Sequence, residues 1–422
     1  MKRQLISSVL VTMSFFALTS GMERPCWATQ TSPPVQVTDY FGTVTEVTLG
    51  VEDNGRIHVV WAGTPDGTFD YVLYYSTSTD GLTWSPAYLL SDGGHARIAV
   101  DDVHDRVHII YAGGGKINHR TVVNGVVSPE TVLDVQVDDV FVVAPEIDVD
   151  QSSGDAYALW VRADFVYPAT FVPVYSHWDG TSWSAPASPS GDDNDMWDTI
   201  AVGDDGTVLV AGVDAYDRVK AIYSTDGLTF GSIETVSGSY PPGEEDGDIW
   251  AIWAPFDQTF HIVTDHFLYP GSSEVYHFVR DPASGAWSAP ENLTVGSTDG
   301  WSAPRYIGSV AGVPYLYASW LEVDTLADFV AFQARTANAS ALGEIHTVGD
   351  DFADFNVGMG TTTRFASFLD ANGTPHAAVG AYENVSLGVF YQRLDAPPAP
   401  FDGIFADGFE SAGFSMWSLT VQ

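Results

Sequence analysis

A repeated pattern is the feature that most limits the folds open to this chain. Each copy has a short apolar strand, an acidic or glycine-containing turn and a second apolar strand, and the copies recur about every fifty residues, a period typical of propeller blades or arrays. The seven copies are LGVEDNGRIHVVW (49–61), IAVDDVHDRVHIIY (98–111), IDVDQSSGDAYALW (147–160), IAVGDDGTVLVAG (200–212), IWAPFDQTFHIVTD (252–265), GSVAGVPYLYASW (308–320) and FLDANGTPHAAVG (368–380). Asp-Gly and Asn-Gly turns between β-branched and aromatic residues are typical of hairpins.

Further strand-like sequence follows the copies. Residues 71–90, 174–186, 221–236 and 275–293 add a third and a fourth strand to four of the copies, and residues 119–133 do so without the turn signature. No sustained helical period interrupts this pattern. Four antiparallel strands in each of seven units predict an all-β fold, a seven-bladed β-propeller of four-stranded antiparallel blades.

The last copy ends before it has a fourth strand. Its third strand is VFYQRL (389–394), whereas PVQVTDY (34–40) near the start of the chain resembles the outer strands of other copies. If this N-terminal segment pairs with the last blade, no sheet edge is left open. We therefore predict a ring closed by an N-terminal strand.

The N-terminus resembles an export signal. Lys2 and Arg3 give a charged start, and residues 5–20 form an apolar run that is short and serine-rich for a membrane span. A membrane anchor is the alternative interpretation. Cleavage at the end of residues 1–28 would remove Cys26, the only cysteine, so the mature chain would have no disulfide and no integral membrane span.

The predicted organisation is a signal peptide at 1–28, a β-propeller at 29–395, a proline-rich linker at 396–402 and a C-terminal tail at 403–422. The tail contains DGFES followed by a tryptophan, which resembles a short C-terminal segment on exported proteins of some Gram-negative bacteria. It predicts a sorting or attachment segment, with a tail that packs on the ring or stays disordered as the alternative. The expected location is secreted, at the cell surface or in the periplasm of a Gram-negative bacterium.

The charge of the chain excludes some partners. Lys and Arg number 16 against 55 Asp and Glu, which gives a formal net charge of −39. Such a chain repels phosphate backbones and anionic membrane surfaces, so we expect no nucleic-acid partner. The sequence also lacks a nucleophile elbow, a zinc-protease motif, a phosphate loop and a dinucleotide fingerprint. We therefore expect no cofactor, with Ca²⁺ as the exception considered below.

Two nearly identical strings, STDGLTW (78–84) and STDGLTF (224–230), resemble the Asp-box of sialidase-like (BNR repeat) β-propellers of the exported bacterial type, with one residue fewer between Asp and Gly. The residues assigned to the boxes are Asp80, Trp84, Asp226, Phe230 and, in a degenerate copy, Asp179 and Trp183. A short carboxylate can accept hydrogen bonds from the amides of its own turn, over which the aromatic ring then packs. The resemblance implies that the boxes join strands 3 and 4 on the face away from any active site, and we expect a structural role.

Four histidines, His58, His108, His261 and His376, occupy the same place in the second strand of four copies. Symmetry-related positions point to different places around a ring, so they cannot converge on one metal ion. We predict a structural role for them.

Candidate ligand-binding residues lie in and after the loops that lead into each first strand. Trp197, Trp250 and Trp301 could pack on sugar rings, with Asp198, Asp248 and the arginines Arg97, Arg305 and Arg364 taking hydroxyls or charged groups. Two other interpretations stay open. The acidic runs Asp192, Asp193 and Asp195 or Glu244, Glu245 and Asp246 could bind calcium. The same residues could instead form a solvated acidic rim.

The resemblance also allows a test for sialidase chemistry. It implies three arginines that clamp a substrate carboxylate, for which Arg97, Arg305 and Arg364 are in equivalent places. Against it, the repeats number seven where sialidases have six blades, and no Tyr–Glu nucleophile pair can be assigned. The predicted function is therefore extracellular or surface recognition of a glycan. A sialidase-like glycoside hydrolase is the first alternative, and a calcium-binding scaffold for protein interaction is the second.

Overall fold

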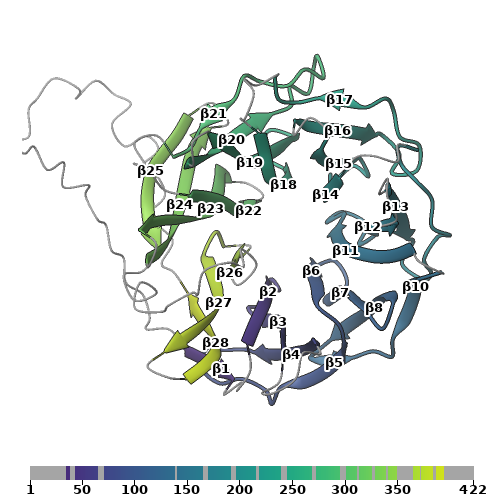
Figure 1. The fold of residues 1–422 in the computed structure, drawn as a ribbon, viewed down its shortest axis with the longest axis vertical. Helices are drawn as coiled ribbons and strands as arrows, with labels where there is room; N and C mark the ends of the chain where they lie inside the picture. Colours follow the sequence, from purple (N-terminus) through teal and green to yellow (C-terminus); the bar gives the residue numbers. More distant parts are fainter. Residues whose placement is uncertain are drawn as a thin grey trace, which may run out of the picture.

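The computed structural model of the chain describes residues 35–38, 43–64, 71–137, 140–164, 170–191, 196–214, 218–238, 245–268, 272–294, 301–310, 313–325, 328–338, 341–348, 365–370, 372–383 and 386–393. Every regular element in these ranges is a β-strand, and the strands form seven antiparallel sheets arranged about a common centre (Figure 1). The predicted all-β class is confirmed. The described part of the chain has no apolar helix long enough to cross a membrane.

The sheets follow one another along the chain. The first sheet contains β2 (Thr43–Val51), β3 (Ile57–Thr64), β4 (Val72–Ser78) and β5 (Tyr88–Asp92), and the second contains β6 (His95–Asp101), β7 (Arg106–Gly113), β8 (Lys116–Val123), β9 (Val126–Val127) and β10 (Thr131–Val135). The third contains β11 (Val140–Val149), β12 (Ala156–Asp164) and β13 (Thr170–Trp178), the fourth β14 (Met196–Val202), β15 (Val208–Val213), β16 (Val219–Ser224) and β17 (Glu234–Thr235), and the fifth β18 (Glu245–Ala254), β19 (Thr259–Leu268), β20 (Ser272–Val279) and β21 (Glu291–Asn292). The sixth contains β22 (Trp301–Val310), β23 (Val313–Thr325), β24 (Asp328–Asn338) and β25 (Ala341–Val348), and the seventh contains β26 (Phe365–Leu369), β27 (Pro375–Glu383) and β28 (Ser386–Arg393), with β1 (Val35–Thr38) at its outer edge.

The N-terminal strand completes the last sheet, as predicted. β1 pairs with β28, with Val35 opposite Tyr391 and Gln36 opposite Phe390. The first strand of the seventh sheet, β26, also contacts β2, the first strand of the first sheet. The two ends of the described chain therefore meet at one place in the arrangement.

The third sheet has three strands where four were predicted. Ala187 makes a single bridge to β13: its amide donates to the Tyr175 carbonyl (3.0 Å), and its carbonyl accepts from the Tyr175 amide (2.7 Å). Pro189 lies two residues further on, at the position where the Leu293 amide of the fifth sheet donates to the Val275 carbonyl. Because proline has no amide hydrogen to donate, the ladder cannot extend beyond Ala187 in this direction.

The hydrophobic core lies between neighbouring sheets. Each buried cluster combines residues of two adjacent sheets, for example Val60 and Leu73 of the first sheet with Ile109 and Tyr111 of the second. The second strands are buried on both faces and read as continuous apolar runs, such as IHVVWAGT in β3. Burial of one large apolar side chain stabilises a fold by roughly 1.5–3 kcal/mol, so the stacked sheets hold the inner strands firmly in place.

Candidate functional site

The three turns that resemble Asp-boxes are each tied by hydrogen bonds to an aspartate. Asp80 Oδ1 accepts hydrogen bonds from the amides of Leu82 (2.8 Å) and Thr83 (2.7 Å), while Ser78 Oγ accepts one from the Gly81 amide (2.9 Å). Gly81 has φ +69°, a left-handed conformation that favours glycine. Asp226 makes the same pair of bonds, to the amides of Leu228 (2.9 Å) and Thr229 (2.6 Å), and Asp179 does so to those of Thr181 (2.9 Å) and Ser182 (2.8 Å).

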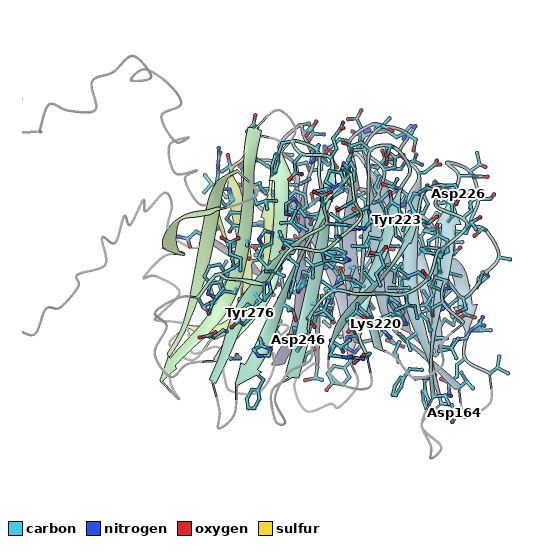
Figure 2. The ribbon with its side chains drawn as sticks, turned by 90° about the horizontal axis from the view of Figure 1, so that it is seen from above. Asp164, Lys220, Tyr223, Asp226, Asp246 and Tyr276 are labelled. Atoms are coloured by element: carbon cyan, nitrogen blue, oxygen red, sulfur yellow. The ribbon has the colours of Figure 1, made fainter. Side chains whose placement is uncertain are left out.

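The aromatic residue of each box contacts the preceding sheet. Trp84 packs edge-on against Tyr391 of the seventh sheet, with ring centroids 5.3 Å apart, and Phe230 packs in the same way on Tyr175 of the third (5.1 Å). Figure 2 shows Asp226 at one end of the molecule, with Asp164 and Asp246 towards the other. The boxes therefore fasten neighbouring sheets together on the face opposite the loops that lead into the first strands.

Asp80→Ala is expected to lower the melting temperature at pH 7 without changing ligand binding. The Thr83 and Leu82 amides lower the pKa of the Asp80 carboxyl below its ordinary 3.8, so the turn is stabilised above that pH and loses this contribution as the pH falls further. Thermal melts at pH 7 and pH 3 measure the effect, which should shrink at pH 3. Asp80→Asn, which keeps the Oδ1 acceptor, is the control and should melt above Asp80→Ala. An unchanged melting temperature for Asp80→Ala at pH 7 would contradict the assigned role.

The four equivalent histidines connect turns to neighbouring strands. One ring nitrogen of each histidine faces an acid of the preceding turn: for His58, His108, His261 and His376 in that order, the acids are Glu52, Asp101, Asp257 and Asp370. The other ring nitrogen contacts a residue of the next strand, which in the same order is Tyr75, His119, His277 and Tyr391. All four are buried. Among the residues that the structure describes, no group of three or more His, Cys, Asp or Glu side chains could hold a metal ion. Burial and these contacts fit the structural role predicted for the four histidines.

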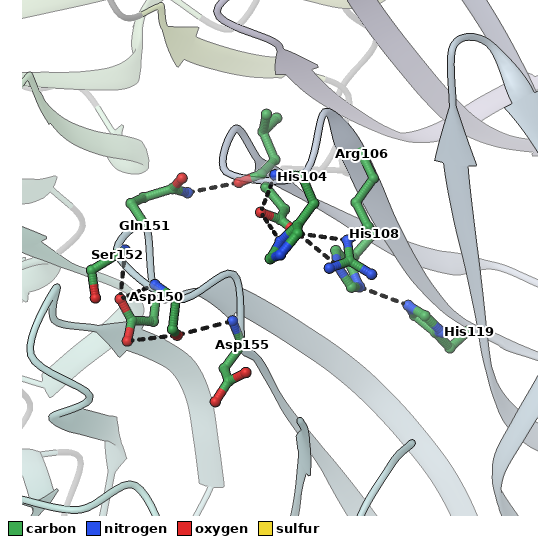
Figure 3. Close-up of polar contacts among 11 residues, drawn as sticks. His104, Arg106, His108, His119, Asp150, Gln151, Ser152 and Asp155 are labelled. Carbon is green, nitrogen blue, oxygen red and sulfur yellow. Dashed lines mark hydrogen bonds and ion pairs between the residues drawn. The ribbon is translucent and has the colours of Figure 1, made fainter. Parts of the chain in front are cut away.

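The hydrogen-bond pattern in the second sheet determines the tautomers. The Trp183 indole N–H donates to His119 Nδ1 (3.2 Å), so a neutral His119 carries its proton on Nε2 and donates it to His108 Nδ1 (2.9 Å). His108 Nε2 then bears a hydrogen and lies 3.9 Å from Asp101 Oδ2 (Figure 3). Burial lowers the pKa of both imidazoles, which keeps them neutral.

A cavity of about 1060 Å³ lies along the first strands of the sheets. Its wall includes one charged residue from each of five consecutive sheets, which we call the belt: Glu46 on β2, Arg97 on β6, Glu146 on β11, Asp198 on β14 and Asp248 on β18. Trp250, two residues after Asp248, lines the same cavity. The belt and Trp250 form the candidate site.

Strand irregularities accompany the belt. The pairing register shifts between Val44 and Glu46 in β2, between Val143 and Glu146 in β11, between Trp197 and Thr199 in β14, and between Asp246 and Ile249 in β18. Ala144, in the β11 irregularity, has φ +51°. Bulges redirect side chains and occur often beside functional sites. Here they lie where an apolar inner strand presents a charged residue to the cavity.

Arg97 is the centre of the ionic contacts in the belt. Its Nη1 bonds the Glu46 carboxylate, its Nε lies 2.8 Å from Glu146 Oε1, and its guanidinium carbon lies 5.5 Å from the centroid of the Trp250 ring. Both glutamates are largely buried. Burial of Arg97 lowers its pKa, but the negative charges of the two glutamates raise it more, so the pKa lies above its ordinary value. His95 Nδ1 adds a contact of 3.1 Å to Glu46 Oε2. Because its charge is shared by two glutamates, Arg97 is not the substrate clamp that the sequence suggested.

Two belt carboxyl groups titrate near neutral pH. Burial raises the pKa of Glu146 to about 7; Arg97 opposes this rise, whereas the negative charges of Glu46 and Asp198 add to it. Burial likewise raises the pKa of Asp198 to about 7, with a further contribution from Asp248. Carboxyl groups tuned in this way can donate or accept protons at pH 7.

Only some of the ligand-binding candidates predicted from the sequence lie together in the structure. Arg97, Asp198, Asp248 and Trp250 come together on the cavity wall. Trp197 was wrongly predicted to face a ligand: it is fully buried, and Lys220 Nζ lies 4.2 Å from its ring centroid. Trp301 and Arg305 belong to β22, where Arg305 lies at the register shift between Pro304 and Tyr306, but their side chains are outside the described part, as are Arg364, Asp192, Asp193 and Asp195.

Asp246, considered above for calcium, already has protein partners. Its carboxylate is buried, accepts a hydrogen bond from Ser237 Oγ (2.7 Å) and lies 3.1 Å from His266 Nδ1. Glu46 and Glu146 were missed in the sequence. The signal for them is a glutamate among the apolar and β-branched residues of an inner strand, in TVTEVTLGV and VFVVAPEIDV, because a buried charge needs a partner.

Comparison with known proteins identifies the fold but no family. No family model matches the chain, and no curated protein sequence matches it. The BP39L lectin from Burkholderia pseudomallei matches with a TM-score of 0.57 and 11% identity, over 85% of this chain and 99% of the lectin. A polysaccharide lyase, an ulvan lyase bound to -[GlcA(1-4)Rha3S]-, matches with a TM-score of 0.56 and 13% identity, over 86% and 96% of the two chains. These two similarities show a propeller-like fold.

Proposed function

We propose that residues 29–395 form one closed seven-bladed β-propeller, and that the protein is exported from a Gram-negative bacterium to act in the periplasm, at the surface or outside the cell. Seven sheets with contacts between the last and the first support the ring. The export signal at residues 1–28 and the tail at 403–422 support the location.

The proposed function is carbohydrate binding at the belt. The observation that carries it is Trp250, a half-buried tryptophan on the wall of a large cavity that also carries the belt carboxylates and Arg97. An aromatic face packs on the apolar face of a sugar ring, and charged groups bind its hydroxyls with strong hydrogen bonds. Ile307 and Trp320 lie in the cluster against which Trp250 packs, so the ring is held in position before a ligand arrives. A lectin and a polysaccharide lyase with this fold are consistent with the proposal.

A glycoside hydrolase is the second candidate. Glu146 and Asp198, with pKa values raised to about 7, are the observation that favours it, because a general acid must stay protonated near neutral pH. The sialidase-like form has less support, since Arg97 is already neutralised by Glu46 and Glu146.

A glycan array followed by calorimetric titration tests the binding function. We expect hits that compete with one another for one site and that weaken in a Trp250 variant. A folded protein with no hit on a broad array would refute carbohydrate binding. A parallel screen with fluorogenic glycosides, sialosides included, separates a hydrolase from a binding protein. Melting curves with calcium and with a chelator test the calcium scaffold, for which a stabilising ion must shift the melting temperature.

A further inference from the structure

We propose that Asn124 is a site of spontaneous deamidation in the folded protein, at which asparagine is converted into a mixture of aspartate and isoaspartate, and that Arg56 of the neighbouring sheet promotes the reaction. The site is the tip of the hairpin formed by β8 and β9. Neither residue lines the cavity, so the inference does not depend on the proposed carbohydrate binding.

An asparagine followed by glycine can react with its own main chain. The glycine amide nitrogen gives up its proton and attacks the asparagine Cγ, and the bond from Cγ to Nδ2 breaks, so ammonia leaves and a cyclic succinimide forms. Water then opens the ring. Addition of water at Cγ gives aspartate, whereas addition at the main-chain carbonyl carbon gives isoaspartate, in which the chain continues through the side chain. Glycine favours the attack because it has no Cβ to hinder it.

The sequence contains three such pairs, Asn54-Gly55, Asn124-Gly125 and Asn372-Gly373. The first pair is held at both reacting groups. The Asn54 side chain donates from Nδ2 to Glu52 Oε2 and accepts from the Arg56 amide at Oδ1 (2.9 Å), and the Gly55 amide donates to the Glu52 carbonyl (2.8 Å). These bonds must break before the nitrogen can reach Cγ, so they protect Asn54.

The third pair is held at its nucleophile. The Gly373 amide donates to the Asp370 carbonyl (2.8 Å), and the Asn372 amide donates to Asp370 Oδ1 (2.9 Å). Gly373 is also buried. The nitrogen that would attack is therefore engaged and shielded from water, which protects Asn372.

The Asn124-Gly125 pair has no such restraint. Asn124 (φ +52°) and Gly125 (φ +77°) form the two-residue turn between β8 and β9, a conformation typical of type I′ hairpins. Asn124 is exposed, and within the described ranges neither its side chain nor the Gly125 amide makes a hydrogen bond.

The tip of this hairpin is weakly held. β8 and β9 share two residue pairs, Val122 with Val127 and Val123 with Val126, and Val126 is 71% exposed. The left-handed turn must open before the Gly125 nitrogen can reach Cγ. Because the tip has few pairs and buries little apolar surface, this opening costs little free energy.

Arg56 places a positive charge beside the turn. Its Nη1 lies 2.8 Å from the point that a Cβ on Gly125 would occupy, although Arg56 belongs to the turn between β2 and β3 of the first sheet. A nearby positive charge favours the anionic form of a group, here the deprotonated Gly125 amide and the negative oxygen of the tetrahedral intermediate. The contact between the two sheets therefore lowers the barrier at Asn124.

The product changes the hairpin and leaves the sheet in place. Isoaspartate lengthens the main chain by a methylene group, which a two-residue turn cannot accommodate while both pairs of β8 and β9 are kept. β8 stays paired with β7 and β10, which form the main ladder of the second sheet. Deamidation is therefore expected to release β9 alone.

Peptide mapping by mass spectrometry tests the inference on the full chain, incubated at pH 8 in water labelled with heavy oxygen, once folded and once unfolded in urea. The unfolded rate of each asparagine is the reference for its folded rate. We expect the ratio of folded to unfolded rate to be at least about 10-fold higher for Asn124 than for Asn54 and Asn372, because hydrogen bonds that must break add to the barrier. Equal ratios, a higher ratio at Asn54 or Asn372, or no reaction at Asn124 in the folded protein would overturn the proposal.

Substitution of Arg56 tests its part in the reaction. Arg56→Gln should slow deamidation of Asn124 about 3- to 10-fold in the folded protein and leave the rate in urea unchanged, while Arg56→Lys, which keeps the charge, should retain most of the rate. Lys116→Gln, which removes an exposed positive charge at the far end of β8, is the matched control and should change nothing. Wild-type rates in both Arg56 variants would overturn the role of Arg56.

Discussion

Replacing Trp250 by alanine should weaken glycan binding by about 30- to 100-fold, or about 2–3 kcal/mol, the loss typical of a central tryptophan in a binding site. The substitution removes the aromatic face that lies beside the belt and also takes away the ring above which the Arg97 guanidinium lies. Trp250→Phe keeps a smaller aromatic face, so its affinity should fall between that of the wild type and that of Trp250→Ala. Calorimetry on the three proteins, with the best ligand from the array, measures the series.

Trp84→Ala is the matched control for this prediction. Trp84 belongs to an Asp-box and packs on Tyr391, away from the cavity. Its loss should lower the melting temperature and leave affinity unchanged. If Trp84→Ala weakened binding as much as Trp250→Ala, or if Trp250→Ala bound normally, the belt would not be the binding site.

Arg97→Ala should lower the free energy of unfolding by about 3 kcal/mol at pH 7, because it leaves two largely buried glutamates without their shared counterion. The deficit should be larger at pH 9 than at pH 7. Burial already raises the pKa of Glu146 to about 7, and without the guanidinium it would rise further. Well below pH 7 Glu146 is protonated in both folded proteins and makes no difference between them, whereas above pH 7 it ionises readily only beside Arg97, so the deficit grows as the pH rises through 7.

Urea unfolding of wild type, Arg97→Ala and Arg97→Lys at the two pH values measures this effect. Lysine keeps the charge but has no planar guanidinium to reach both carboxylates. The free energy of unfolding of Arg97→Lys should therefore lie between those of the wild type and Arg97→Ala. A loss below about 0.5 kcal/mol, the size of an ordinary surface change, would mean that the Glu46–Arg97–Glu146 contacts do not stabilise the fold. The same loss at pH 7 and pH 9 would contradict the assigned protonation of Glu146.

The repeat predicted the fold well because its signals are local. Strand alternation and Asp-Gly turns depend on nearby residues, and the Asp-box carboxylates bond the amides two and three residues further on. The outer strand supplied by residues 35–38 was also predictable, since one blade was a strand short and the N-terminal segment had the sequence of one. The missing strand of the third sheet was signalled by Pro189, which lies where the ladder needs a donating amide.

The site was harder to predict because register decides which side chains face the cavity. Trp197 and Trp250 have similar surroundings in the sequence, DNDMWDTI and EDGDIWAI. Trp197 precedes the irregularity of its strand and pairs with Gly212, whereas Trp250 follows the irregularity of β18 and pairs with Val263. A shift of one residue moves a side chain to the other face of a strand, so only Trp250 lines the cavity. The positions of such bulges depend on tertiary packing and cannot be read from one sequence.

We propose that this protein binds a glycan at Trp250 and the belt, and a crystal structure with the best ligand from the glycan array tests this proposal most directly. We expect a sugar ring packed face-on against Trp250, with sugar hydroxyls within hydrogen-bond distance of the belt carboxylates. A sugar bound elsewhere, between the outer strands or on the Asp-box face, with the cavity at Trp250 empty, would contradict it.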